Sequence, residues 1–164
     1  MAPLIISISG VRGIVGETLG AAEAVVWGQA YGTFLRDTSR GDRPTVCIGR
    51  DSRPSGGMLA AGLAAGLMAT GCDVIHLGIV TTPGAALMTR FLQTDGGVVL
   101  TASHNPIEWN GIKFLRHDGI AYPAEEAKRI HRNYHEKYFR LEKATHVGKS
   151  REDGRTHAVH VDTV

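Results

Sequence analysis

The sequence predicts an α/β domain, in which helices flank both faces of a mixed, mostly parallel sheet. Segments rich in Val and Ile alternate with segments of helical periodicity along the 164 residues. Glycine accounts for 21 residues, roughly twice its average share, which is typical of a chain with sharp turns or closely packed backbones. The hydrophobic content of 43% is sufficient for the sizeable core of one domain.

The apolar runs, each bounded by turn residues, predict five strands. We expect them near Leu4–Ser7, Thr45–Gly49, Asp73–Leu77, Gly97–Thr101 and Gly111–Leu115. The pair Asn110-Gly111 is a strong turn signal, and it predicts that the last strand folds back on the chain before it. Alternation along that strand would point Lys113 away from Ile112 and Phe114.

Two long helices are expected between these strands. In the segment 21–36 one apolar, core-facing stripe is formed by Trp27, Tyr31, Phe34 and Leu35. The segment 57–70 contains no charged residue, so its helix must be buried on most of its surface, and Gly62 and Gly66 would permit close packing against the sheet. Shorter helices are predicted to begin near Pro83 and Pro123, because proline suits the first helical turn.

Composition and charge narrow the classes of function. The net charge of +2 comes from 18 basic and 16 acidic residues spread along the chain, so neither a nucleic-acid partner nor a membrane partner is expected. The first residues lack the basic region of a secretory signal, and the predicted helix 57–70 is too short to span a bilayer, which favours the cytoplasm. Cys47 and Cys72 follow no ligand spacing and are interpreted as reduced core thiols.

The candidate chemistry is concentrated in one stretch, residues 101–106 with the sequence TASHNP, followed by NGIK at 110–113. It brings together the hydroxyl of Ser103, the imidazole of His104 and the ammonium of Lys113. A serine becomes a group carrier when donors and an acid/base group converge on it. Ser103 also lies two residues beyond a predicted strand, where ligand sites gather in open α/β sheets. The same residue types are common in plain polar turns, which is the alternative interpretation.

Three motifs together resemble the α-D-phosphohexomutases, the family of phosphoglucomutase, phosphomannomutase and phosphoglucosamine mutase. They are the serine stretch, the run SGVRG at residues 9–13 and the run GRDSRPSG at residues 49–56. The resemblance implies that Ser103 carries a phosphate, donates it to a hexose monophosphate and takes one back from the hexose 1,6-bisphosphate, so that 1-phosphate and 6-phosphate interconvert. It implies that Lys113 is the general acid/base and that His104 and Arg12 stabilise phosphate oxygens, beside turn glycines that let the backbone approach the phosphate.

The resemblance covers only the first of the family's four domains. It implies Mg²⁺ bound through the phosphate of Ser103, but the Asp-x-Asp-x-Asp loop that supplies the family's other metal ligands has no counterpart here, nor do its sugar-selecting loop and its last phosphate-binding loop. We expect the first domain over residues 1–148, and a linker with the truncated start of a second domain over 149–164. Hexose phosphate and the remaining domains are the expected partners, and little or no turnover is expected from this chain alone. Thr101 at the start of the loop favours a glucose or mannose mutase within the resemblance, without fixing the sugar.

Two other classes of function remain open. A phosphate- or phosphosugar-binding module would use Arg12 and the serine stretch to bind ligand without ever being phosphorylated. A structural docking domain would neither bind the ligand nor be phosphorylated. Arg50 and Arg53 are left outside the catalytic set, because surface ion pairs explain them equally well. His131 and His135 have a spacing that suits zinc, but the charged residues around them are typical of a solvated helix face, and no metal is predicted there. The chain has neither the phosphate-binding loop of nucleotide triphosphatases nor the G-x-S-x-G elbow of α/β-hydrolases.

Overall fold

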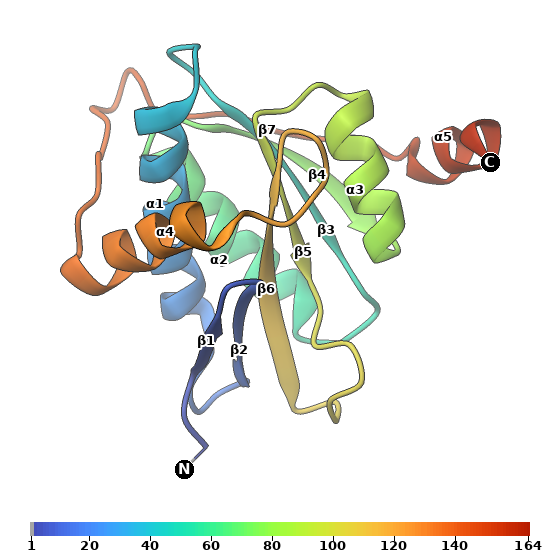
Figure 1. Cartoon of the computed structure of the whole chain (residues 1–164), viewed down its shortest axis with the longest axis horizontal. Coiled ribbons are helices and arrows are strands. Elements are labelled where there is room, and N and C mark those ends of the chain that lie inside the picture. Colours follow the sequence, from blue (N-terminus) through green and yellow to red (C-terminus); the bar gives the residue numbers. More distant parts are fainter. Residues whose placement is uncertain (1) are drawn as a thin grey trace.

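The computed structural model describes residues 2–164 and contains one mixed sheet with helices on both faces, which confirms the predicted fold class (Figure 1). The seven strands of the sheet have the order β1-β2-β6-β5-β3-β4-β7. Their bounds are β1 Ile5–Ser7, β2 Gly10–Ile14, β3 Thr45–Arg50, β4 Asp73–Ile79, β5 Gly96–Leu100, β6 Trp109–Arg116 and β7 Ser150–Glu152. The strands β5, β3, β4 and β7 pair in parallel, whereas β1, β2, β6 and β5 pair antiparallel to their neighbours.

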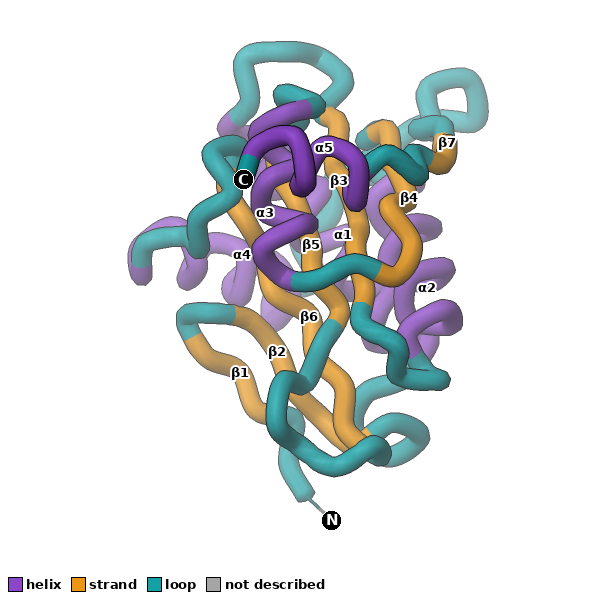
Figure 2. Tube along the Cα trace, turned by 90° about the vertical axis from the view of Figure 1, so that its right-hand side faces the viewer, coloured by secondary structure: helices purple, strands orange, loops and turns teal. Residues whose placement is uncertain are grey.

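The helices form the two outer layers (Figure 2). Helices α1 (Ala21–Thr38), α2 (Gly56–Ala69) and α4 (Ala124–Glu136) pack around the larger hydrophobic core, while α3 (Thr82–Phe91) and α5 (Thr156–Thr163) lie on the other face. The predicted apolar stripe of α1 is fully buried, and its Trp27 stacks on Tyr134 of α4 with ring centroids 3.8 Å apart. None of the helices described is long and apolar enough to cross a membrane.

The contact between α1 and α2 depends on glycine. A Cβ on Gly66 would lie 2.1 Å from the carbonyl oxygen of Val25, and one on Gly28 would lie 2.4 Å from that of Leu63. The prediction that Gly62 and Gly66 pack against the sheet is therefore wrong, because both glycines face α1. A charge-free helix has two apolar faces, and its sequence does not say which of them meets the sheet.

The antiparallel half of the sheet differs from the prediction at two places. The SGVRG run, expected as a turn, forms most of β2, in which Arg12 pairs with Gly111 of β6. The turn predicted at Asn110-Gly111 is also wrong, since both residues lie inside β6 and the chain reverses in the loop before them. A Cβ on Gly111 would lie 2.7 Å from the carbonyl oxygen of Thr101 and 2.8 Å from that of Val11. This glycine therefore permits a close crossing of backbones rather than a tight turn.

The segment after residue 148 extends the same sheet. Ser150–Glu152, placed in the expected linker, instead form the edge strand β7 parallel to β4, and α5 packs against α3. The backbone N–H of Val74 donates to the carbonyl of Lys149 at 2.8 Å, just before this pairing begins. The domain boundary at residue 148 stays a prediction.

Both cysteines are buried free thiols, as predicted. Burial raises the pKa of the Cys72 thiol to about 11 and also raises the pKa of Cys47. Both side chains therefore stay protonated at neutral pH and behave as small apolar residues of the core.

The glycine contact between α1 and α2 can be tested by substitution. Gly66→Ala is expected to lower the free energy of unfolding by about 2 kcal/mol, because the new methyl group overlaps the backbone of α1. Gly57→Ala in the same helix is the matched control: no atom lies within 4 Å of its added Cβ, so stability stays equal or rises slightly. Urea unfolding of both variants measures the difference, and an unchanged midpoint for Gly66→Ala would contradict the close helix contact.

Candidate functional site

The serine stretch forms the loop between β5 and β6, drawn in yellow at the bottom of Figure 1. We call residues 101–108 the serine loop. It begins at the carboxyl end of β5, which pairs in parallel with β3 on one side and antiparallel with β6 on the other. Ligands of open α/β sheets bind beyond the carboxyl ends of strands. The fold thus places the candidate serine where such sheets hold their sites.

Ser103 is exposed and has a left-handed backbone conformation, with φ of 55°. This conformation costs a residue with a side chain about 1 kcal/mol, so other contacts must hold it. One of them comes from the buried Thr101, whose Oγ1 accepts a hydrogen bond from the Ser103 backbone N–H at 3.1 Å. His104, the next residue, is also exposed.

Arg12 and Lys113 line one small hollow beside the serine loop. The hollow has a volume of about 210 Å³ and its other lining residues are Ile5, Ser7, Ser9, Gly10, Val11 and Thr101. Arg12 reaches the loop directly, because its Nη1 donates to Oδ1 of Asn105 at 2.9 Å. Lys113 is half-buried in the hollow while Ile112 and Phe114 enter the core, so its side chain has the orientation that the strand alternation predicts.

The pairing of β2 with β6 brings these two cations together. Lys113 lies opposite Gly10 in the register, and Arg12 lies opposite Gly111. Gly10 has φ of 145°, and a Cβ there would lie 2.1 Å from the carbonyl oxygen of Ile112. Only glycine fits at this position, so Gly10 of the SGVRG run allows β2 to pack closely on β6. Arg12 of the same run lines the hollow.

Arg53, which the sequence interpretation set aside, is tied to the serine loop by both terminal nitrogens of its head group. Its two terminal nitrogens donate to the backbone carbonyls of Ser103 (3.1 Å), Asn105 (2.7 Å), Pro106 (2.6 Å) and Trp109 (3.1 Å). Its Nε contacts Asp51 at 3.3 Å, so the expected ion pair is present as well. Only 12% of the side chain is exposed. Sequence reasoning missed this contact because backbone carbonyls carry no residue-type signal.

Asn110 anchors the far end of the loop. The residue is fully buried, and its side-chain amide donates to Oγ of Ser55 at 2.8 Å while its Oδ1 accepts from the N–H of Gly111. Ser55 immediately precedes α2, so the loop is fastened to the start of a helix. The amide that resembled a turn residue is therefore a buried connector.

The described residues do not supply a complete metal site. Among residues 2–164 no group of three or more His, Cys, Asp or Glu side chains lies together in a way that could hold a metal ion. Ser103 itself offers one oxygen, or phosphate oxygens once it is modified, which is fewer ligands than Mg²⁺ takes. The residues present therefore do not by themselves fit the metal that the sequence resemblance implies.

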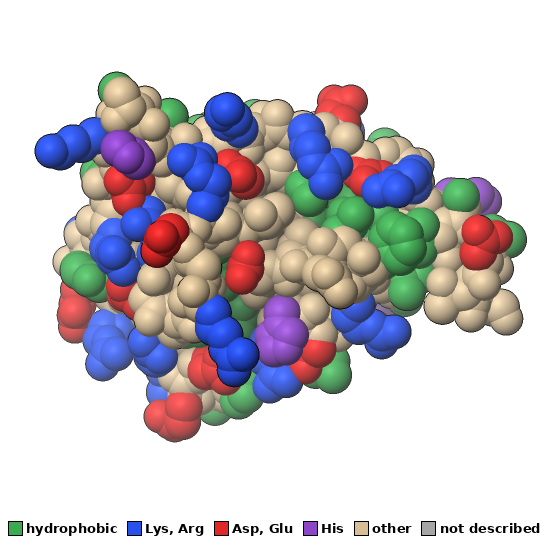
Figure 3. Space-filling model, turned by 90° about the horizontal axis from the view of Figure 1, so that it is seen from above, with side chains coloured by type: hydrophobic (Ala, Val, Ile, Leu, Met, Phe, Trp, Pro, Cys, Tyr) green, Lys and Arg blue, Asp and Glu red, His purple; other side chains and the backbone are tan. Residues whose placement is uncertain are grey.

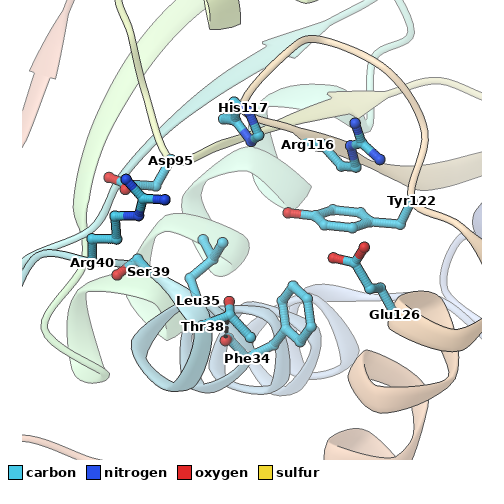
Figure 4. A pocket seen from close by; sticks show the side chains of 10 residues that line it. All are labelled: Phe34, Leu35, Thr38, Ser39, Arg40, Asp95, Arg116, His117, Tyr122 and Glu126. Carbon is cyan, nitrogen blue, oxygen red and sulfur yellow. Dashed lines mark hydrogen bonds between the residues drawn. The ribbon is translucent and has the colours of Figure 1, made fainter.

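A larger cavity lies elsewhere. It measures about 690 Å³ and is reached beside Asp95, which precedes β5, so it sits at the end of that strand opposite the serine loop (Figure 4). Arg40 and His117 line it together with the acidic Asp95 and Glu126. Basic and acidic side chains are also interspersed on the upper face of the molecule (Figure 3). Such mixed charge selects no class of ligand, and the cavity lacks the serine loop's combination of nucleophile and cations.

Comparison with known proteins finds relatives that all belong to one family. Residues 5–141 match the family model described as phosphoglucomutase/phosphomannomutase, alpha/beta/alpha domain I. The chain is 42% identical over 144 residues to a phosphoglucomutase/phosphomannomutase of Thermococcus kodakarensis, covering 88% of this chain and 31% of that protein. It is 47% identical over 121 residues to a phosphoglucosamine mutase of a Thermoanaerobacter species, covering 74% of this chain and 27% of that protein.

The fold comparison agrees with the sequence comparison. The crystal structure of a phosphoglucomutase/phosphomannomutase family protein from Burkholderia thailandensis superposes with a TM-score of 0.76 at 27% identity, covering 92% of this chain and 34% of that one. The chain thus spans about a third of the length of the relatives it matches. Since the family model covers most of the residues, including the serine loop and both arginines that contact it, the chain belongs to the phosphoglucomutase/phosphomannomutase family and corresponds to its α/β/α domain I.

Proposed function

We propose that this chain is the phosphate-carrying domain of a phosphosugar mutase that interconverts hexose 1-phosphate and hexose 6-phosphate. The observation that carries the proposal is the exposed Ser103, held in a left-handed conformation on a loop to which Arg12 is bonded. Membership of the family supports the class of reaction. Relatives named for glucosamine and for glucose or mannose both match, so the preference that Thr101 implies for glucose or mannose stays a prediction.

The proposed reaction consists of two phosphoryl transfers, one from Ser103 to the sugar and one from the sugar back to Ser103. In the first transfer the bond between phosphorus and Oγ of phosphorylated Ser103 breaks, and a bond to a hydroxyl of the hexose monophosphate forms. Lys113 takes the proton of that hydroxyl as general base. The hexose 1,6-bisphosphate then turns over, its other phosphate returns to Oγ of Ser103, and Lys113 gives the proton back to the sugar oxygen. Atoms and charge balance over the cycle.

The cations have distinct parts in this proposal. Arg12 lies beside Lys113 in the hollow and is fixed by Asn105, so it is suited to neutralise phosphate oxygens as charge shifts during transfer. His104 is exposed next to the nucleophile and would contact the same phosphate. Ser103, through its phosphate, would be the contribution of this chain to Mg²⁺ binding, with the other ligands supplied by the remaining domains. Action in the cytoplasm also stays a prediction.

Phosphate on Ser103 is the decisive expectation. Tandem mass spectrometry of the full-length protein, before and after incubation with a hexose 1,6-bisphosphate and Mg²⁺, is expected to locate a phosphate on Ser103. Ser103→Ala removes it, whereas Ser52→Ala, at another exposed serine, keeps it. An unmodified Ser103 in folded protein under both conditions would favour the phosphosugar-binding module, and absence of saturable hexose phosphate binding in calorimetry would favour the docking domain.

Lys113 is expected to act on the rate of transfer rather than on binding. Lys113→Gln in the full-length protein should lower kcat by about 100-fold or more, the usual contribution of a general acid/base, and leave the affinity for hexose phosphate within a few-fold. Lys149→Gln, which removes an exposed lysine next to β7, is the control and keeps normal turnover. Steady-state kinetics in a coupled mutase assay measure kcat for both variants, and a loss of less than about tenfold in the kcat of Lys113→Gln would refute this role.

The chain by itself is expected to show little or no turnover, because the described residues hold no complete metal site and the chain spans only about a third of the length of its relatives. The measurement is a mutase assay of the isolated chain, purified from a host that lacks its own mutase, with the full-length protein as the positive control. Robust turnover by the isolated chain would overturn this expectation but would not count against the proposed phosphoserine mechanism.

A further inference from the structure

We propose that Arg53 is a positioning residue, which holds the serine loop in the shape that presents Ser103 for phosphoryl transfer. The inference rests on the proposed function and adds a residue to it. Arg53 comes from the segment between β3 and α2, about fifty residues away from the loop along the chain. Its head group lies inside the curve of the loop, where four backbone carbonyls converge on it.

The guanidinium has no donor left for a ligand. Its five N–H groups match five contacts, three with carbonyls of the serine loop, one with the carbonyl of Trp109 at the start of β6 and one with Asp51. An arginine whose head group is saturated in this way and whose side chain is 12% exposed is not placed to bind phosphate. Arg12, by contrast, is half-buried in the hollow and contacts the loop only through the side chain of Asn105, so the two arginines have different tasks.

The carbonyls explain why a cation is needed at this position. Four carbonyl oxygens that point toward one centre repel one another, and the positive head group turns this repulsion into attraction. The same contacts point the negative oxygen ends of the carbonyl dipoles at Arg53 and away from the dianionic phosphate that the loop is proposed to carry. One of the four carbonyls belongs to Ser103 itself, so Arg53 acts directly on the residue with φ of 55°.

Two other contacts limit how far the loop can move when Arg53 is removed. The buried side chain of Asn110 fastens the end of the loop to Ser55, and the N–H of Asn105 donates to the carbonyl of Ala102 within the loop. Neither contact reaches the peptide between Ser103 and His104. Loss of Arg53 is therefore expected to loosen the segment around the nucleophile while β5 and β6 stay paired.

The test compares Arg53→Gln, Arg53→Lys and the unsubstituted protein, all full-length, by hydrogen exchange and by steady-state kinetics. In Arg53→Gln, exchange in the peptide covering residues 101–109 is expected to become at least about fivefold faster while peptides from β4 and α3 stay unchanged. Displacement of a nucleophile costs about 100-fold in rate, so kcat should fall by that order with KM within about threefold. Arg53→Lys keeps the charge but offers fewer donors in another geometry, and it should recover only part of the loss.

Arg50→Gln is the matched control. It removes the same charge from the last residue of β3, where Arg50 lines a different cavity with His76 and Glu152. Its exchange in residues 101–109 and its kcat are expected to stay within about twofold of the unsubstituted protein. If Arg50→Gln lowers kcat as much as Arg53→Gln, or if Arg53→Lys is fully active, the arginine contributes only a positive field and the positioning role is wrong.

The remaining outcomes also decide the inference. Unchanged exchange in the loop of Arg53→Gln, or unchanged kcat despite faster exchange, would overturn it. Faster exchange throughout the protein with a lowered melting temperature would show a general structural role instead, and that also overturns it. If the unsubstituted protein carries no phosphate on Ser103 and has no turnover, the proposed function fails separately, while the exchange data still tell whether Arg53 holds the loop.

Discussion

The site depends on a place in the sheet where three backbone segments cross more closely than side chains allow. Gly10 and Gly111 leave room for β2, β6 and the first residue of the serine loop to lie against one another. Arg12 and Lys113, separated by about a hundred residues along the chain, share one hollow because of this crossing. A Cβ at either glycine would push β2 away from β6 and would separate the arginine from the loop that it contacts.

The sequence was sufficient to predict the parts of the fold that have a period. The apolar stripe of α1, the parallel strands and the orientation of Lys113 follow from spacing along the chain, and all are present. Asn110-Gly111 was misread, because a turn and a close backbone crossing both select glycine and the one-dimensional pattern is the same for both. Strand β2 was missed for a similar reason, since glycines at both ends of its short arginine-containing run favour a turn.

The candidate site could be predicted only where its chemistry resides in side chains. Ser103, His104, Lys113 and Arg12 were found as residue types, and the structure adds that Arg12 reaches the loop through Asn105. The contribution of Arg53 was not predictable, because its partners are carbonyl groups that every residue possesses. Burial and hydrogen-bond geometry, which only the folded chain provides, distinguish it from Arg50, the last residue of β3.

A rigid loop and an exposed nucleophile together suit a reaction in which the substrate must turn around. Phosphoryl transfer requires a fixed attacking distance, and Arg53 would supply it by bonding to backbone carbonyls of the loop while the side chain of Ser103 stays exposed. A bisphosphate that presents first one phosphate and then the other needs that space to remain open. In the proposed reaction, Arg12 and Lys113 would hold a phosphate rather than enclose the sugar, so this domain alone is not expected to select the sugar.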